Sequence, residues 1–218
     1  MPHKAQPLSC HPSICIQNLP ELISHFLYEQ KNPDSPIPVE LVARDDLPEH
    51  DGKIFVYSLA IVIFCAPSDV SGTCSMRSEH IRSTVQWWGG PAHCNCVFIK
   101  HSRELPGFHG LYVAQVKALL KVVHEHKDYP CAVVSWFLTM GDTPCHDTGL
   151  WMVKHNLDRG SKVMSIVHLN TILHGAHLIG ILGKPFIPKD MPSTDLLSAF
   201  KTFFMNKYID YRTHKIAW

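Results

Sequence analysis

The stretch from residue 111 to residue 137 constrains the fold most, because it is the longest apolar and weakly charged passage of the chain. From Tyr112 to Val122 every second residue is apolar, and this period of two is typical of a β-strand. Residues 124–128 are polar and predict a turn, and residues 131–137 alternate again, which predicts a returning strand. We therefore expect a β-hairpin on which the rest of the chain packs. A helix is the alternative for the first arm, because its apolar residues also fit a helical stripe.

Short strands separated by turn signals are predicted along most of the remaining chain. The run of β-branched and aromatic residues at 54–65 predicts a strand that is buried throughout. The segment 70–91 is rich in turn residues and is predicted to be irregular, with at most a helical turn over 76–82. Further strands are expected at 96–101, 150–154, 163–169 and 171–181.

Helices are predicted only near the two ends. Asn18, with Glu21 three residues later, has the pattern of a capping box for a short N-terminal helix. Ser193 or Thr194 is expected to cap a C-terminal helix with an apolar stripe of Leu197, Phe200, Phe204 and Tyr208. The predicted fold is mainly β, a curled sheet or barrel with flanking helices. Three regions are expected: 1–50, a tail, short helix and Pro-rich linker; 51–191, a β-barrel-like domain; and 192–218, a C-terminal helix packed on the barrel.

The charge balance and the missing motifs exclude several function classes. The chain has 20 lysines and arginines against 19 aspartates and glutamates, so its net charge of +1 gives no overall field for nucleic acid, although local patches remain open. No apolar segment is long enough to span a bilayer, which predicts a soluble intracellular protein with no membrane partner. Gly-rich phosphate loops are absent, so no nucleotide cofactor is expected. The eight cysteines are expected to be free thiols.

Reactive chemistry has three candidates, each with a plainer interpretation. The segments 93–96 and 145–146 supply Cys and His of the kind zinc selects, but C-x-C is not the usual zinc spacing. The triplet at 147–149, Asp-Thr-Gly, resembles the loop of retroviral-type aspartic proteases, which pair two carboxylates, and a simple turn is the alternative. No local pattern selects a Cys–His pair for nucleophilic catalysis. We therefore predict no enzyme, no metal site and no cofactor.

Aromatic residues form the candidate binding set. Aromatic side chains at a barrel mouth cage a methylated lysine by cation–π contact or stack an extruded base. For tryptophans in predicted strands core packing is the alternative, and for those in a Gly-rich loop exposure is equally expected. Basic residues beside that loop are candidates for phosphate contacts. The predicted binding residues are Trp87, Trp88, Arg77, Arg82, Tyr112, Trp136 and Trp151.

A set of short motifs resembles one fungal family, the C-terminal region of proteins encoded by Plavaka-type DNA transposons of mushroom-forming fungi. The resemblance covers nearly the whole chain. Trp88 stands where the family usually has Arg, and Cys94-Asn95 where it has Tyr-Asp. The resemblance implies a fragment whose parent carries the catalytic carboxylates upstream, so neither strand transfer nor DNA cleavage is expected here. The motifs lie at 66–72, 76–83, 87–91, 96–99, 129–132, 136–137, 141–142, 147–151, 166–169, 176–179 and 206–208.

The order of the predicted strands also resembles that of BAH domains, which are chromatin-associated SH3-like barrels with extensions. This second resemblance implies an SH3- or BAH-like curled sheet or barrel. Together the two predict a non-catalytic interaction module derived from a DNA transposase, docking a histone tail, DNA or a protein partner, with the nucleus as a compatible location. A retropepsin-like aspartic protease, or a vestigial protein with no ligand, is the alternative.

Overall fold

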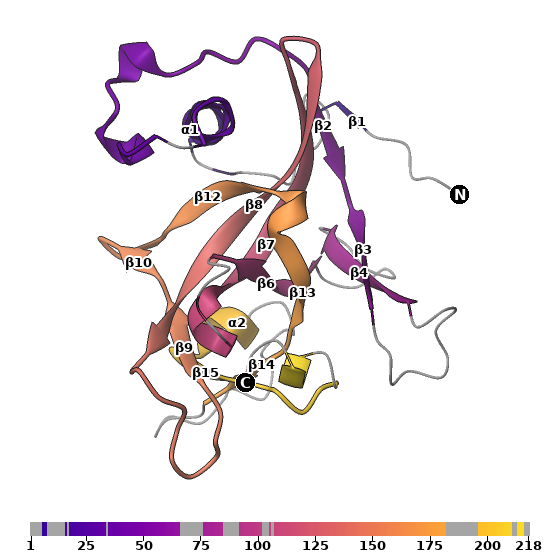
Figure 1. Ribbon diagram of the computed structural model, residues 1–218, viewed down its shortest axis with the longest axis vertical. Coiled ribbons are helices and arrows are strands. Elements are labelled where there is room, and N and C mark those ends of the chain that lie inside the picture. The colour runs from indigo at the N-terminus through magenta and orange to yellow at the C-terminus, as the bar shows by residue number, and fades with distance from the viewer. Residues whose placement is uncertain are drawn as a thin grey trace.

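A long antiparallel hairpin is the spine of the molecule (Figure 1). Its arms are β7 (Leu111–His124) and β8 (Lys127–Met140), paired along their whole length in the computed structural model. The predictions of a hairpin and of a mainly β, barrel-like fold are confirmed, and the helical alternative for the first arm is wrong. The structure describes residues 6–7, 16, 18–33, 35–65, 76–84, 92–101, 105, 107–181, 196–210 and 213–215.

The turn of this hairpin is shorter than the sequence suggested. Only Glu125 and His126 separate the strands, and both have positive φ, 49° and 63°. Such a two-residue turn matches the right-handed twist of the flanking strands, so pairing continues up to His124 and Lys127. The polar residues on either side of the turn therefore belong to the strands.

The sheet divides into two halves because each long strand has two successive neighbours on its outer edge. β7 pairs with β6 (Cys96–Lys100) over its first part and with β2 (Ile54–Tyr57) over its second. β8 pairs with β12 (Met164–His168) and then with β9 (Met152–His155). We call the part flanked by β2 and β12 the upper half, and the part flanked by β6 and β9 the lower half, as they lie in Figure 1.

The lower half curls into a nearly closed barrel. Its strands follow the order β13-β6-β7-β8-β9-β15-β14, where β13 is Ile172–Ala176, β14 is Leu178–Gly180 and β15 is Thr202–Met205. Only His177 separates β13 from β14, so the two ends of this seven-strand sheet are neighbours in sequence. The barrel is filled by a core that includes Phe98, Val113, Phe137, Val153 and Phe203.

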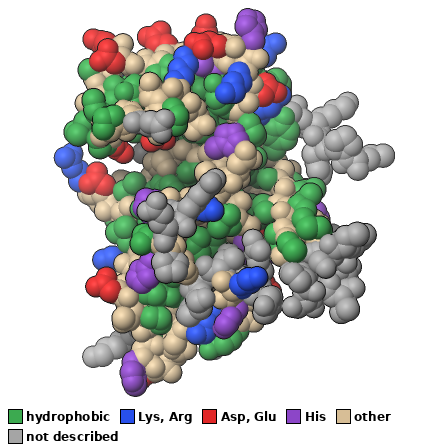
Figure 2. Space-filling model, viewed as in Figure 1, with side chains coloured by type: hydrophobic (Ala, Val, Ile, Leu, Met, Phe, Trp, Pro, Cys, Tyr) green, Lys and Arg blue, Asp and Glu red, His purple; other side chains and the backbone are tan. Residues whose placement is uncertain are grey.

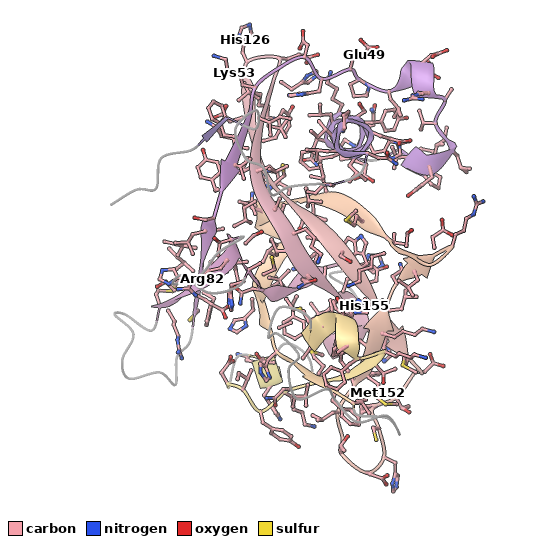
Figure 3. The ribbon with its side chains drawn as sticks, turned by 180° about the vertical axis from the view of Figure 1, so that it is seen from behind. Glu49, Lys53, Arg82, His126, Met152 and His155 are labelled. Carbon is pink, nitrogen blue, oxygen red and sulfur yellow. The ribbon has the colours of Figure 1, made fainter. Side chains whose placement is uncertain are left out.

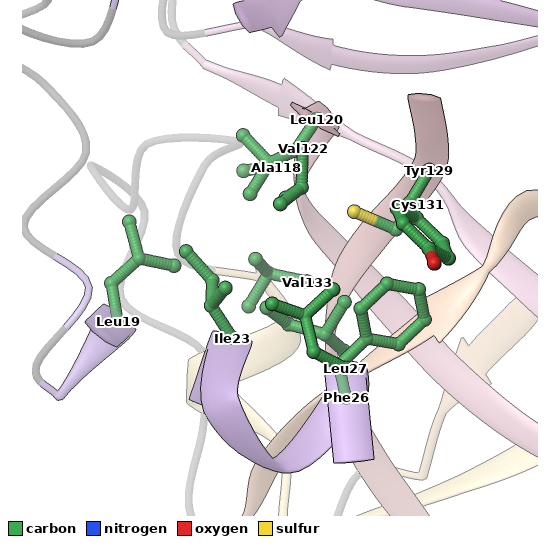
Figure 4. Close-up of a cluster of buried hydrophobic side chains, with 11 residues drawn as sticks. Leu19, Ile23, Phe26, Leu27, Ala118, Leu120, Val122, Tyr129, Cys131 and Val133 are labelled. Atoms are coloured by element: carbon green, nitrogen blue, oxygen red, sulfur yellow. The ribbon is translucent and has the colours of Figure 1, made fainter. Parts of the chain in front are cut away.

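The upper half is covered by a helix instead. α1 (Leu19–Lys31) places Ile23, Phe26 and Leu27 on the concave face of the hairpin, where they meet Leu120, Val122 and Val133 (Figure 4). The predicted helix is confirmed, but its capping box is not: Asn18 is left-handed at φ 60° and its side chain makes no cap hydrogen bond. Burial of the apolar face therefore fixes this helix rather than a cap.

A smaller hairpin covers the outer face of the spine. β3 (Leu59–Cys65) and β4 (Met76–Thr84) pair with each other and bury Ile81 against Val97 and Val116. The prediction of one buried strand at 54–65 is wrong, because the chain leaves the main sheet at residue 58 and Ile63 is 66% exposed. The helical turn predicted over 76–82 is wrong as well, since β4 is extended. Figure 2 shows the resulting apolar patch on this hairpin.

The C-terminal region corrects another prediction. Among the described residues the expected helix is represented by α2 (Leu196–Ala199), and its predicted caps Ser193 and Thr194 lie outside them. Phe204 instead lies in β15, between β9 and β14. The segment follows the two-residue alternation of a strand rather than a helical stripe. Phe203 and Met205 point into the barrel core and are 1% and 0% exposed. The remaining elements are β1 (Gln6–Pro7), β5 (His93–Cys94), β10 (Leu157–Asp158), β11 (Ser161–Lys162) and the 3-10 turns Val39–Leu41, Arg44–Asp46, Gly107–Gly110 and Leu169–Thr171.

Within the described part of the chain, neither helix has the length and apolar character needed to cross a membrane.

Candidate functional site

The predicted binding residues fall into separate places. Trp87 and Trp88 lie outside the described residues. Arg77 and Arg82 lie on β4, where the backbone of Arg82 exchanges hydrogen bonds with the side chain and backbone of Asn95, at 2.7 and 3.0 Å. The arginines thus belong to the small outer hairpin, and Figure 3 shows Arg82 there.

Trp151 is a core residue. It is 5% exposed and its ring stacks on Phe108, with centroids 5.0 Å apart and planes 25° from parallel. His109 contacts it edge-on at 5.2 Å. Both partners come from the 3-10 turn Gly107–Gly110 that precedes β7, so Trp151 closes the barrel and has no open face for a ligand.

Tyr112 and Trp136 meet on the outer face of the lower half. Their rings are 5.6 Å apart and nearly perpendicular, at 74°. His101 lies over Tyr112 at 4.2 Å and 32°. Tyr112 is 44% exposed, Trp136 is partly exposed and His101 is exposed. We call these three side chains the aromatic shelf.

The register of the spine explains this meeting. Ala114 pairs with Trp136, so Tyr112 lies two residues along the same face, within reach of a large ring. Trp136 is held in place because its Nε1 donates a 2.8 Å hydrogen bond to the Ser165 hydroxyl on β12. One wall of the shelf is therefore fixed to the sheet and the other is open to solvent.

A cationic side chain accompanies the shelf. Leu138, 43% exposed, follows Trp136 on this face and pairs directly with the exposed Lys154 on β9. Lys100 is exposed too, but it pairs with Leu111 of the barrel core and therefore belongs to the face opposite Tyr112. The shelf thus combines aromatic faces with positive charge, a combination suited to a ligand with planar rings and phosphates.

A buried histidine that sequence reasoning missed joins the outer hairpin to the barrel. His174 on β13 is 3% exposed, with its Nδ1 3.6 Å from Glu79 Oε2 and its Nε2 3.7 Å from Asp210 Oδ2. Glu79 also accepts a 2.8 Å hydrogen bond from the Gly175 backbone. No sequence signal links these three ionisable residues, because they are brought together from three distant parts of the chain.

The motifs considered for catalysis lie on turns and in the core. Asp147 sits on a tight turn with its side chain 91% exposed, 3.5 Å from the equally exposed His146. Burial raises the pKa of the Cys96 and Cys131 thiols to about 12, which keeps them protonated and unreactive. Hydrogen bonds led by that of the Thr148 side chain lower the pKa of Cys145. The described residues contain no group of three or more His, Cys, Asp or Glu side chains able to hold a metal ion.

Protein-family models give no match to this sequence, and no curated protein matches it either.

Proposed function

We propose that this chain is a non-catalytic interaction module, derived from a DNA transposase, that binds single-stranded DNA on the aromatic shelf. The observation that carries the proposal is the nearly perpendicular pair formed by Tyr112, which is 44% exposed, and the partly exposed Trp136. Exposed aromatic faces are the platforms on which unpaired bases stack, and each stacked base contributes about 1–3 kcal/mol.

The charge around the shelf favours DNA over a methylated histone tail. A cage for methylated lysine attracts a cation, and the nearby Lys154 would repel it. The same lysine suits the phosphates that connect stacked bases. The resemblance to transposon-encoded proteins gives the proposal a DNA context, and the exposed Asp147 supports a simple turn rather than a protease site.

A binding measurement on matched tyrosine variants tests the proposal. Tyr112→Ala should weaken binding of a fluorescent oligothymidine about 5- to 150-fold, the equivalent of losing one stacked base. Tyr208→Ala is the control, because Tyr208 is 68% exposed but lies outside the shelf. Fluorescence anisotropy at two salt concentrations should show tighter binding at the lower one.

Two results would count against this function. One is equal affinity of the Tyr112→Ala variant and the unmodified protein, with circular dichroism showing both folded. The other is binding of trimethyl-lysine histone peptides in the absence of DNA binding, which would make the shelf a histone-tail site.

A further inference from the structure

A row of paired residues that includes the polar Gln115 and Ser135 crosses the inner face of the spine between its two apolar clusters. Cys96 pairs with Gln115, Gln115 with Ser135, and Ser135 with Met164, so the row runs across β6, β7, β8 and β12. On one side lies the cluster under α1, and on the other the barrel core. Gln115 and Ser135 are 9% and 1% exposed, so their polar groups are largely withdrawn from water.

Two lysines are directed toward this row by the backbone. Lys117 is the extra residue of a bulge, where the register of β7 against β8 shifts between Val116 and Ala118. A bulge re-aims a side chain, and here it brings Lys117 to the inner face beside the row. Lys162 on β11 lies two residues before Met164, so alternation places it on that face as well.

His155 completes the group from β9. It pairs with Phe137, stacks on that ring at 4.7 Å, and its Nε2 donates a 2.5 Å hydrogen bond to the Leu197 carbonyl of α2. Figure 3 shows His155 in the lower half beside α2. Because Nε2 carries the proton, Nδ1 is an acceptor in the neutral ring and a second donor once the ring is protonated.

Two buried polar atoms of this group lack hydrogen-bond partners. The Ser135 hydroxyl and His155 Nδ1 are buried and make no hydrogen bond. Burial and, to a lesser extent, the charge of Lys117 lower the pKa of Lys162. Burial also lowers the pKa of His155; the hydrogen bond to the Leu197 carbonyl opposes this shift, and the charges of Lys162 and Lys117 add to it. Neither lysine forms an ion pair with a carboxylate of the described residues. Buried donors and like charges without partners cost free energy, and an anion would relieve both costs.

We propose that Lys117, Lys162, His155, Ser135 and Gln115 form a binding site for the phosphate group of a small molecule on the inner face of the barrel half. The two ammonium groups match the two charges of a phosphate dianion, and the hydroxyl and amide donate to its remaining oxygens. This site lies on the face opposite the aromatic shelf and does not depend on it. A carboxylate would offset only one of the two lysines.

The group lies at the point where the sheet changes from a helix-covered half to a barrel. A structural role would be served by apolar residues there, as in both flanking clusters. The bulge at Lys117 and the unsatisfied hydroxyl of Ser135 instead keep polar groups where packing would exclude them. Deviations of this kind are expected where a site binds a ligand.

Calorimetric titration of the whole chain tests the site. The probes are inorganic phosphate and glycerol 3-phosphate, at constant ionic strength in chloride, and the second probe distinguishes a free ion from an organic phosphate. Saturable binding of either is expected, at least about tenfold weaker in Lys162→Met. Lys53→Met is the matched control, because Lys53 is exposed at the other end of the molecule (Figure 3). Affinity should also fall as the pH rises and Lys162 loses its proton.

Absence of saturable heat with both phosphates overturns the site, and so does equal affinity in Lys162→Met, Lys53→Met and the unmodified protein. If Lys162→Met fails to fold, Ser135→Ala takes its place, with weaker phosphate binding expected and unchanged binding decisive against the site. Because Tyr112 is not involved, failure here leaves the DNA proposal standing, and the reverse also holds.

Discussion

The two halves of the spine cover the inner face of the same long hairpin in different ways. In the upper half, the inner face of β7 and β8 carries Ala118, Leu120 and Val133, and α1 covers it with Ile23, Phe26 and Leu27. In the lower half, the same two strands curl into a barrel and carry Gln115 and Ser135 at its upper edge. The upper half is thus packed with apolar side chains, whereas the lower half keeps buried polar groups inside and the aromatic shelf outside. Both proposed binding sites therefore lie in the lower half.

Each half of the spine contains one buried cysteine, and the largest expected effect is a difference in the rate of thiol modification. Cys131 belongs to the upper core and Cys96 to the lower, and burial raises the pKa of each to about 12. This lowers the thiolate fraction at neutral pH on the order of 1,000-fold. Iodoacetamide should therefore modify Cys145, whose pKa is lowered, long before either of them.

The modification rates of Cys96 and Cys131 compare the two halves directly. Unsatisfied polar groups near Cys96 make local opening of the lower half easier, so Cys96 should react faster than Cys131. Inorganic phosphate should slow the modification of Cys96 by iodoacetamide and leave that of Cys131 unchanged. Peptide mass spectrometry over a time course measures both rates. Equal rates, equally affected by phosphate, would mean that the halves open together.

Truncation of the helix core should produce the largest change in stability. Phe26 is 1% exposed and contacts Tyr129 edge-on at 6.2 Å. Phe26→Ala should lower the free energy of unfolding by about 3–5 kcal/mol, because it leaves a cavity under α1. Leu41→Ala is the control, since Leu41 is 76% exposed, and it should change stability by less than about 0.5 kcal/mol. Urea denaturation measures both, and similar losses would show that α1 is not the principal support.

The shelf should tolerate the loss of one hydrogen bond. Trp136→Phe removes the 2.8 Å bond to Ser165 but leaves an aromatic ring on the outer face. Stability should fall by about 1 kcal/mol, the usual net contribution of one hydrogen bond. Oligothymidine binding should change far less than in Tyr112→Ala. A loss of binding without a loss of stability would show instead that the indole itself contacts the ligand.

The fold was predictable where a single periodicity dominates. Every second residue of the spine from Tyr112 to Val122 is apolar, and this period predicts its strand correctly. The bulge at Lys117 could not be predicted, and because of it Val116 packs on the outer face whereas Ala118 packs on the inner face. Residues 197–208 fit a helical stripe as well, and β15 forms only because β9 and β14 lie on either side of it. The strand at 54–65 looked buried from its composition, but nothing in its local sequence shows that it divides at residue 58 to serve two sheets.

The site was predictable only in part. Tyr112 and Trp136 were chosen for their chemistry, but their contact depends on the register of the spine, which residues alone do not give. Trp151 has the same chemistry and lies in the core. No sequence pattern marked Lys117 and Lys162 as neighbours, because a bulge in β7 and the hairpin of β10 and β11 bring them to the same face. Sequence indicates the chemistry that is present, and tertiary pairing decides which groups meet.

One pair of variants on the same strand tests the contrast most directly. Ser135 and Val133 are both buried on the inner face of β8, one beside the lysines and the other under α1. Val133→Ala should lower the free energy of unfolding by about 2 kcal/mol, because it removes apolar contacts. Ser135→Ala should leave stability equal or up to about 1 kcal/mol higher, because it removes an unpartnered hydroxyl, while phosphate binding weakens. A loss in Ser135→Ala as large as in Val133→Ala, with phosphate binding unchanged, would contradict the account.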